Sequence, residues 1–192
     1  MSDRDDIIDL TIAYTWALDT KNIEGLREVF LPDATADLRG RWCEGIDAIM
    51  ARIGGSVMRF DSTQHMIGNH RVVVTGDTAT SSCHLQSQHT RYGLEGGENC
   101  IVGGSYHDDL VRTPNGWRIK HRRLEQRWTD GNPNVLKSWA NVYAELPDCE
   151  LKSLVLSRIE SLSQSLSKAF AKAFEEAFRK ALAKLNSFPH WS

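Results

Sequence analysis

Apolar residues near the start of the chain recur at the spacing of an α-helix and would share one buried face: Ile7, Leu10, Tyr14 and Leu18. Asp3 is a suitable N-cap, so this pattern predicts a helix over roughly residues 4–19. A second apolar group predicts a short helix over about 22–30, which Pro32 would end because proline disfavours helical geometry in the preceding residue.

The following segment combines short strands with one more helix. Residues 34–44 predict two short strands around a turn at Arg39-Gly40. Residues 45–53 predict a third helix, which Gly54-Gly55 would close.

From about residue 62 the pattern changes to that of β-strands, with strand-like runs over 71–75, 78–92, 99–112 and 117–128. The connections carry Gly, Asn and Asp, which favour tight turns between antiparallel neighbours. Strands of this length favour a strongly curved sheet whose concave side must be filled. We therefore predict an α+β fold: a cone-shaped α+β barrel whose curved antiparallel sheet wraps over the N-terminal helices and leaves a pocket between them.

The last part of the chain differs in composition, since residues 151–186 are rich in Ser, Ala, Lys and Leu and contain no Gly or Pro. Their large apolar residues recur every four positions, which predicts one long amphipathic C-terminal helix. The expected division is a barrel domain over 1–133 and a helical extension over 134–192. Packing on the barrel or self-association is the ordinary role of such a helix, and a position on a membrane surface is the alternative because lysines flank the stripe.

Composition narrows the classes of function. The 192 residues suit one well-buried domain, and a net charge of −2 gives no global attraction to nucleic acid. No signal peptide and no membrane-spanning stretch is visible. The four cysteines lie far apart, which argues against a zinc site or a disulfide framework and fits a reducing cytoplasm. We expect a cytoplasmic protein with no metal, no other cofactor and no nucleic-acid partner.

Two residues form the leading candidate for chemistry. Asp19 ends the first predicted helix, and His65 lies just before the long strands. A carboxylate that holds an imidazole in one tautomer makes a general base near neutral pH. The alternative is a solvent-facing Asp19, although an acid at a helix C-terminus is unfavourable without a partner. Tyr14, on the apolar face of the same helix, is either a core residue or a proton donor.

Further candidates come from the alternation of the strands. His89 shares the less polar face of its strand with Leu85 and Ser87, so it should line the pocket. Tyr106 and Asp108 share one face of the next strand, where Asp108 is either a pocket group or the partner of a strand arginine.

The last long strand adds charged and aromatic candidates. Arg122 and Arg123 point to opposite faces, so only one of them can enter the pocket. Trp117 and Trp128 are predicted as core residues or pocket walls.

These motifs together resemble a known family. The order of Phe30-x-Pro32-Asp33-Ala34, Thr63-x-His65-x-x-x-Asn69, Gly103-Gly104-x-Tyr106-x-Asp108 and Gly116-Trp117-Arg118-Ile119 resembles the SnoaL-like branch of the nuclear transport factor 2-like superfamily. The resemblance covers roughly residues 3–133. It implies the cone-shaped fold, whereas the superfamily holds many activities as well as binding proteins.

Within this superfamily the spacing resembles scytalone dehydratase, lindane dehydrochlorinase and bile-acid 7α-dehydratase. The resemblance implies that Asp19 and His65 form a catalytic pair, that Tyr14 and His89 assist it, and that an arginine from the last long strand serves the site. His89 stands where the bile-acid enzyme has a second aspartate, and the long C-terminal helix is not typical of the family.

The resulting hypothesis is a cofactor-independent lyase, of dehydratase type or cleaving by a retro-aldol reaction, or an isomerase. Its substrate would be small, hydrophobic, hydroxylated and cyclic or aromatic. The alternative is a non-catalytic module that binds a small ligand or builds an oligomer. An epoxide hydrolase of the limonene type is disfavoured because its Asp-Arg-Asp set has no clear match. A homo-oligomer, a dimer or larger, is expected because the open face of such a sheet is usually buried against another subunit.

Overall fold

The computed structural model describes residues 2–137. Its helices are α1 (Asp3–Asp19), the 3₁₀ helix η1 (Ile23–Glu28), α2 (Ile46–Val57) and the 3₁₀ turn η2 (Pro133–Leu136). Its strands are β1 (Phe30–Leu38), β2 (Trp42–Glu44), β3 (Ser62–Thr75), β4 (Thr78–Thr90), β5 (Asn99–Thr113) and β6 (Gly116–Gly131). The predicted C-terminal helix lies outside the described residues.

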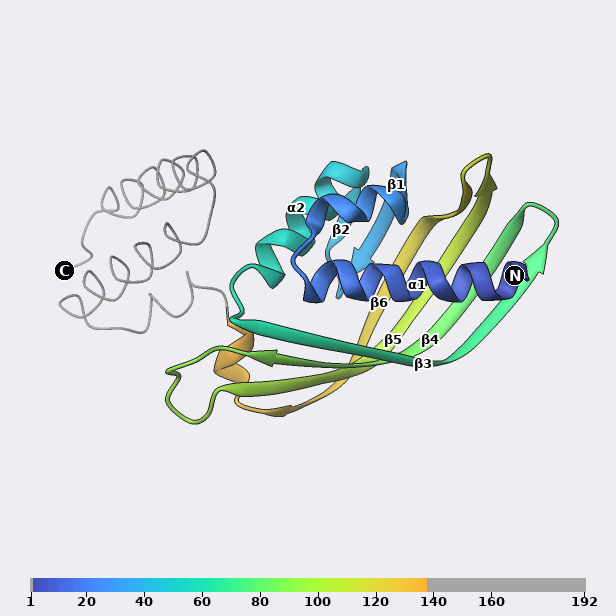
Figure 1. Cartoon of the computed structure of the whole chain (residues 1–192). Helices are drawn as coiled ribbons and strands as arrows, with labels where there is room; N and C mark the ends of the chain where they lie inside the picture. Colours follow the sequence, from blue (N-terminus) through green and yellow to red (C-terminus); the bar gives the residue numbers. More distant parts are fainter. Residues whose placement is uncertain (1, 138–192) are drawn as a thin grey trace. The chain divides into compact units, whose positions relative to one another are not determined.

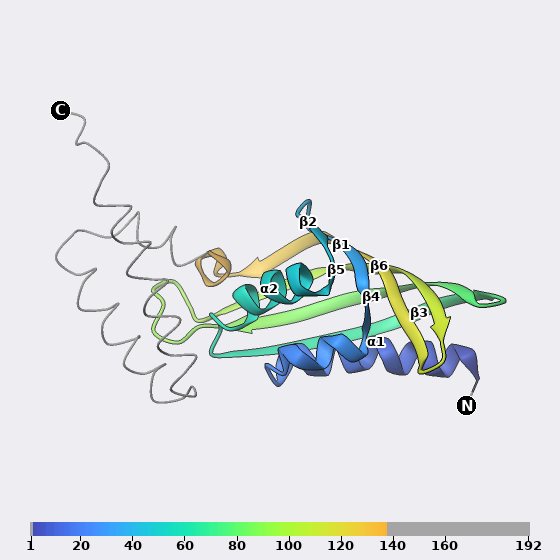
Figure 2. The same cartoon turned by 90° about the horizontal axis from the view of Figure 1, so that it is seen from above.

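The strands form one six-stranded sheet in the order β2-β1-β6-β5-β4-β3. It bends strongly along its length, and α1 and α2 lie on its concave side (Figure 1, and from above in Figure 2). The expectation of a curved sheet over N-terminal helices is therefore confirmed. The expectation of a purely antiparallel sheet is wrong, because β1 and β6 are parallel. The intervening chain between β1 and β6 is long enough to return in the same direction.

Three local predictions need correction. Ser2, rather than Asp3, caps α1, and it forms a capping box with Asp5. The second helix is a short 3₁₀ helix rather than an α-helix over 22–30. Helix α2 continues through Gly54-Gly55 to Val57, since the burial of Ile53 and Val57 against the core offsets the low helix propensity of glycine.

Two β-bulges in β6 decide which of its side chains enter the cone. In the register with β5, Leu110 faces Ile119 while Asp109 faces His121, so Lys120 is an extra residue. Farther along, Gly104 faces Gln126 and Gly103 faces Trp128, so Arg127 is extra as well. Each extra residue shifts the alternation by one and moves the following side chains to the other face.

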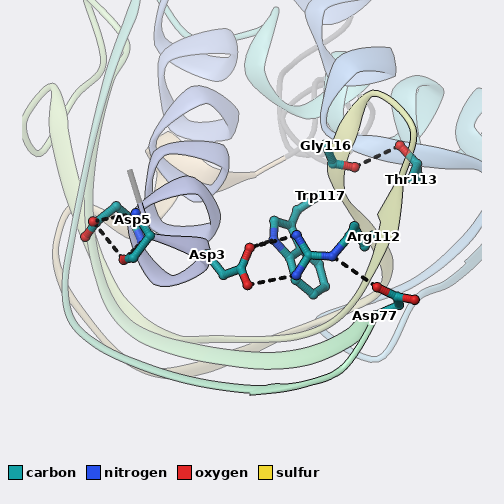
Figure 3. A network of polar contacts seen from close by, with 8 residues as sticks. Asp3, Asp5, Asp77, Arg112, Thr113, Gly116 and Trp117 are labelled. Atoms are coloured by element: carbon teal, nitrogen blue, oxygen red, sulfur yellow. Dashed lines mark hydrogen bonds and ion pairs between the residues drawn. The ribbon is translucent and has the colours of Figure 1, made fainter.

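A polar network holds the start of α1 to the hairpin between β5 and β6 (Figure 3). The guanidinium of Arg112 donates two hydrogen bonds to Asp3, at 2.7 and 2.8 Å, and a further one of 3.1 Å to Asp77. The indole of Trp117 donates to Asp3 as well, at 3.2 Å. Hydrogen bonds from Arg112 and Trp117 lower the pKa of Asp3 to about 2.

This network predicts a pH-dependent contribution to stability. Arg112→Met should lower the Tm at neutral pH, because Asp3 loses its bidentate partner. The folded-state pKa of Asp3 is depressed, so its contribution is complete above about pH 4 and disappears as the pH falls towards 2. The difference in Tm between wild type and variant should therefore narrow over that range. The control is Arg4→Met, and a constant difference down to pH 2 would contradict the assignment.

Candidate active site

Asp19 and His65 are in contact, as the sequence hypothesis requires. The Nδ1 of His65 lies 2.6 Å from Oδ1 of Asp19, and the backbone N–H of His65 donates to Oδ2 at 2.8 Å. The hydroxyl of Thr63 donates to the same carboxylate at 2.8 Å. These donors satisfy the acid at the end of α1, where the helix dipole alone would disfavour it. Thr63 was not among the candidates drawn from the sequence, although it belongs to the motif that contains His65.

This contact keeps Asp19 ionised and sets which tautomer the neutral His65 ring adopts. Burial raises the pKa of Asp19, but the hydrogen bonds from the His65 side chain and backbone and from Thr63 outweigh it, so the pKa lies below its usual value. The ionised carboxylate accepts hydrogen bonds only, hence Nδ1 of His65 carries a proton. The Nε2 of His65 is left with the lone pair that a general base requires. The His65 side chain is only 6% exposed.

A cavity of about 90 Å³ lies against His65. Three catalytic candidates line it, namely Tyr14, His65 and His89, together with the substrate-binding candidate Tyr106. Apolar side chains from α1, α2 and the sheet form most of the rest: Leu18, Ile53, Val57, Leu85, Val102 and Leu124. A small apolar cavity with a few converging polar groups is typical of a ligand-binding site.

His89 faces the cavity as its strand alternation predicts. Its ring packs edge-on against His65, with ring centroids 5.6 Å apart, and against Phe60 at 4.7 Å. Burial, with a smaller effect from His65, lowers the pKa of His89 to about 4. His89 is therefore neutral at physiological pH, and its buried Nδ1 has no hydrogen-bond partner among the described residues. A buried nitrogen in this state is suited to a polar group of a ligand.

Asp108 was predicted either as a pocket group or as the partner of a strand arginine, and it is the partner of Arg122 in β6. Nε and Nη2 of Arg122 each donate to one carboxylate oxygen of Asp108, both at 2.7 Å. Both side chains are essentially inaccessible to solvent. The guanidinium carbon lies 4.0 Å from the centroid of the Tyr14 ring and 4.5 Å from that of Tyr106. The pair and the two rings form a rigid wall beside the cavity rather than open pocket groups.

Tyr14 and Tyr106 meet edge to face, with ring centroids 5.5 Å apart. Burial raises the pKa of both phenols above 10, so both remain protonated at neutral pH. Each phenol therefore keeps its O–H proton.

Besides Asp108 and Arg122, three further residues expected to contact substrate do not line the cavity. Arg123 is exposed, since the bulge at Lys120 turns Arg122 inward instead. Trp128 is 48% exposed and lies over Gly103 on the outer face of the sheet, because the second bulge reverses its side. Trp117 is buried in the core near Asp3, so of its two predicted roles the structure favours core packing.

The sequence reasoning missed two arginines, Arg39 and Arg52, which both line the cavity. Arg39 lies in the turn after β1 with a positive φ of 63°. Arg52 belongs to the same face of α2 as Ile53 and Ser56. The helical spacing of Arg52 and Ser56 could have indicated a shared face. The turn at Arg39-Gly40 was predicted, but the local sequence does not show that this turn lies beside the cavity.

The described residues contain no group of His, Cys, Asp and Glu side chains that could hold a metal ion. Within the same part of the chain, no helix is both long and apolar enough to cross a membrane. Cys43, Cys83 and Cys100 are buried free thiols.

The fold and this site can now be compared with known proteins. The family profile of the SnoaL-like domain matches residues 1–123. The chain belongs to the SnoaL-like family. Uncharacterized proteins of Mycobacterium tuberculosis and Mycobacterium bovis are 37% identical to it over 131 residues, which cover 66% of this chain and 86% of theirs.

Solved structures support this assignment. A Novosphingobium aromaticivorans protein provisionally named an aromatic ring hydroxylase is 27% identical, with a TM-score of 0.62 over 70% of this chain and 96% of that one. A second protein from this organism, provisionally named a scytalone dehydratase, is 25% identical, with a TM-score of 0.59 over 66% and 85% of the two chains. A nuclear transport factor 2-like protein of Salmonella enterica shares the fold at 16% identity, with a TM-score of 0.60 over 66% and 92%.

The buried Arg122–Asp108 ion pair of this SnoaL-like protein predicts that removing one charge will strongly lower the free energy of unfolding. Asp108→Asn should destabilise the protein by about 3–5 kcal/mol, because Arg122 would keep its charge in a dry environment with no carboxylate. The measurement is urea unfolding followed by circular dichroism. Asp109→Asn is a matched control, since Asp109 is the exposed neighbour on the same strand. Equal stability of the two variants would contradict the structural role of the pair.

Proposed function

We propose that this protein is a cofactor-independent lyase or isomerase whose general base is His65. The observation that carries the proposal is the 2.6 Å contact between His65 Nδ1 and Asp19 at the wall of an apolar cavity. The contact fixes the imidazole in the tautomer whose Nε2 accepts a proton. The SnoaL-like family and the provisional dehydratase among its relatives support the same class of reaction.

The proposed reaction is the elimination of water from a small hydroxylated cyclic or aromatic substrate. His65 Nε2 removes a proton from a carbon next to a carbonyl group. The electrons of that C–H bond form the new double bond, and the neighbouring C–O bond breaks with its electron pair. The phenol of Tyr14 protonates the departing oxygen, which leaves as water, and neutral His89 supplies a hydrogen bond to the substrate. A retro-aldol cleavage, or an isomerisation in which the proton returns to another carbon, would use the same groups.

The surroundings of the pair suit this chemistry. Apolar side chains and several polar groups share the cavity wall, so a substrate could be held by both apolar contacts and hydrogen bonds beside His65. Tyr106 and the Arg122–Asp108 pair hold Tyr14 in place. General acid–base catalysis of this kind contributes about 10²–10⁴-fold, and the positioning of the substrate supplies the remainder.

A chromogenic probe tests the base before the natural substrate is identified. Nitrobenzisoxazole opens to a coloured phenolate when a base removes its ring C–H proton, so no cofactor or natural leaving group is needed. Wild type should accelerate this opening, and His65→Ala should reduce the catalysed rate by about 10²-fold or more. Asp19→Asn should reduce it by a similar factor, because the amide no longer fixes the tautomer.

Matched variants make this test specific. His84→Ala is the control, since His84 lies on the outer face of β4 in the same protein. The far-ultraviolet circular dichroism and the Tm should show that every variant is folded. An unchanged rate in folded His65→Ala would contradict the proposal and favour the non-catalytic binding module.

A further inference from the structure

Arginines gather on one side of the His65 cavity, and no carboxylate of residues 2–137 forms an ion pair with them. Arg39, at the end of β1, and Arg52, on α2, both line the cavity. Arg59 follows α2, where its guanidinium stacks 5.1 Å from the centroid of the Phe60 ring. Phe60 in turn packs against His89, so Arg59 and Phe60 lie behind the His89 ring rather than in the cavity lining.

The described carboxylates leave these charges uncompensated. The ion pairs among the described residues include none to Arg39, Arg52 or Arg59. The Nε atoms of Arg52 and Arg59 are buried and have no hydrogen-bond partner in this part of the chain. By contrast, the buried Arg122 has a carboxylate partner, because its Nε and Nη2 both donate to Asp108. Buried arginine nitrogens without a partner are costly, unless a ligand supplies the acceptor.

The mutual repulsion of these arginines is visible in their electrostatics. Burial lowers the pKa of Arg39, and the charge of Arg52 lowers it further. Burial also lowers the pKa of Arg59, with added effects from Arg52 and Arg39 among others. The same positive charges contribute to the low pKa of His89. A negative group placed in this part of the cavity would relieve this repulsion.

We propose that Arg39 and Arg52 bind a carboxylate group of the substrate, so that the substrate is a small apolar carboxylic acid. The planar guanidinium donors match a carboxylate in size and geometry. The apolar residues Leu18, Val57 and Leu85 would contact the body of the acid, and His65 stands at the reacting end. This inference rests on the proposed function, because it takes the cavity as the substrate site.

The test compares two ligands of the same shape and different charge. Benzoate and benzamide are titrated separately into the full-length protein by isothermal titration calorimetry. Wild type should bind benzoate about tenfold more tightly than benzamide. Arg39→Gln and Arg52→Gln should each reduce this preference by about threefold or more, and the double variant should abolish it.

The controls separate this site from a general effect of positive charge. Arg41→Gln removes a charge two residues from Arg39, but Arg41 does not line the cavity, so the preference should persist. If Arg52→Gln lowers the Tm, the preference for benzoate is measured instead in Arg52→Lys, which keeps the charge, and in Arg39→Gln. Arg39 is exposed, so its substitution should leave the fold intact. Equal binding of benzoate and benzamide to wild type, or an unchanged preference in both folded variants, would overturn the assignment. Inorganic phosphate that binds as tightly as benzoate, with the same dependence on Arg39 and Arg52, would overturn it as well.

His65→Ala distinguishes this inference from the proposed function. The variant should keep the preference for benzoate while losing turnover of the chromogenic probe. Turnover that depends on His65 without any preference for benzoate would overturn the carboxylate site alone. A preference for benzoate together with unchanged turnover in His65→Ala would instead overturn the proposed function.

Discussion

The carboxylate of Asp19 joins the end of α1 to the start of β3, and the site depends on this contact. Three hydrogen bonds from Thr63 and His65 converge on it. They offset the repulsion between an acid and the negative end of a helix, so one feature stabilises the junction and orients the imidazole. An apolar residue at position 19 would remove both effects, since neither the helix end nor His65 would then have its partner. Structure and candidate chemistry therefore share a single constraint.

A second constraint is the positive charge at the cavity, which the protein accommodates in two different ways. Arg122 is compensated by Asp108 and by the faces of Tyr14 and Tyr106, and this pair forms a fixed wall. Arg39 and Arg52 line the same cavity without a described carboxylate. The paired charge of Arg122 has a structural role. Unpaired charge of the second kind is what a site for an anionic ligand needs before the ligand arrives.

The sequence predicts the fold well because its signals are local and repeated. Helical spacing in α1, alternation in β4 and glycine-containing turns each point to one structure. The contact of Asp19 with His65 follows from the family motif rather than from spacing, because 46 positions separate the two residues. Alternation likewise places His89 on the inner face of β4, where no bulge interrupts the pairing with β5.

The remaining errors have a common physical origin in β6. Strict alternation from Trp117 and Ile119 would turn Arg123 inward, but the extra residue Lys120 reverses the order and brings in Arg122. A bulge depends on pairing with the neighbouring strand, so its position is not visible in the residues of one strand. The two cavity arginines were missed for a similar reason, because a turn and a helix place them together only in the folded chain.

The most direct test of the central claim is the tautomer of His65. Nitrogen-15 NMR of the histidine side chains distinguishes a protonated Nδ1 from a protonated Nε2 in the neutral ring. The account predicts that His65 carries its proton on Nδ1 in the wild type and that this preference weakens in Asp19→Asn. A proton on Nε2 in the wild type, or the same tautomer in both proteins, would contradict the claim that Asp19 sets up His65 as the base.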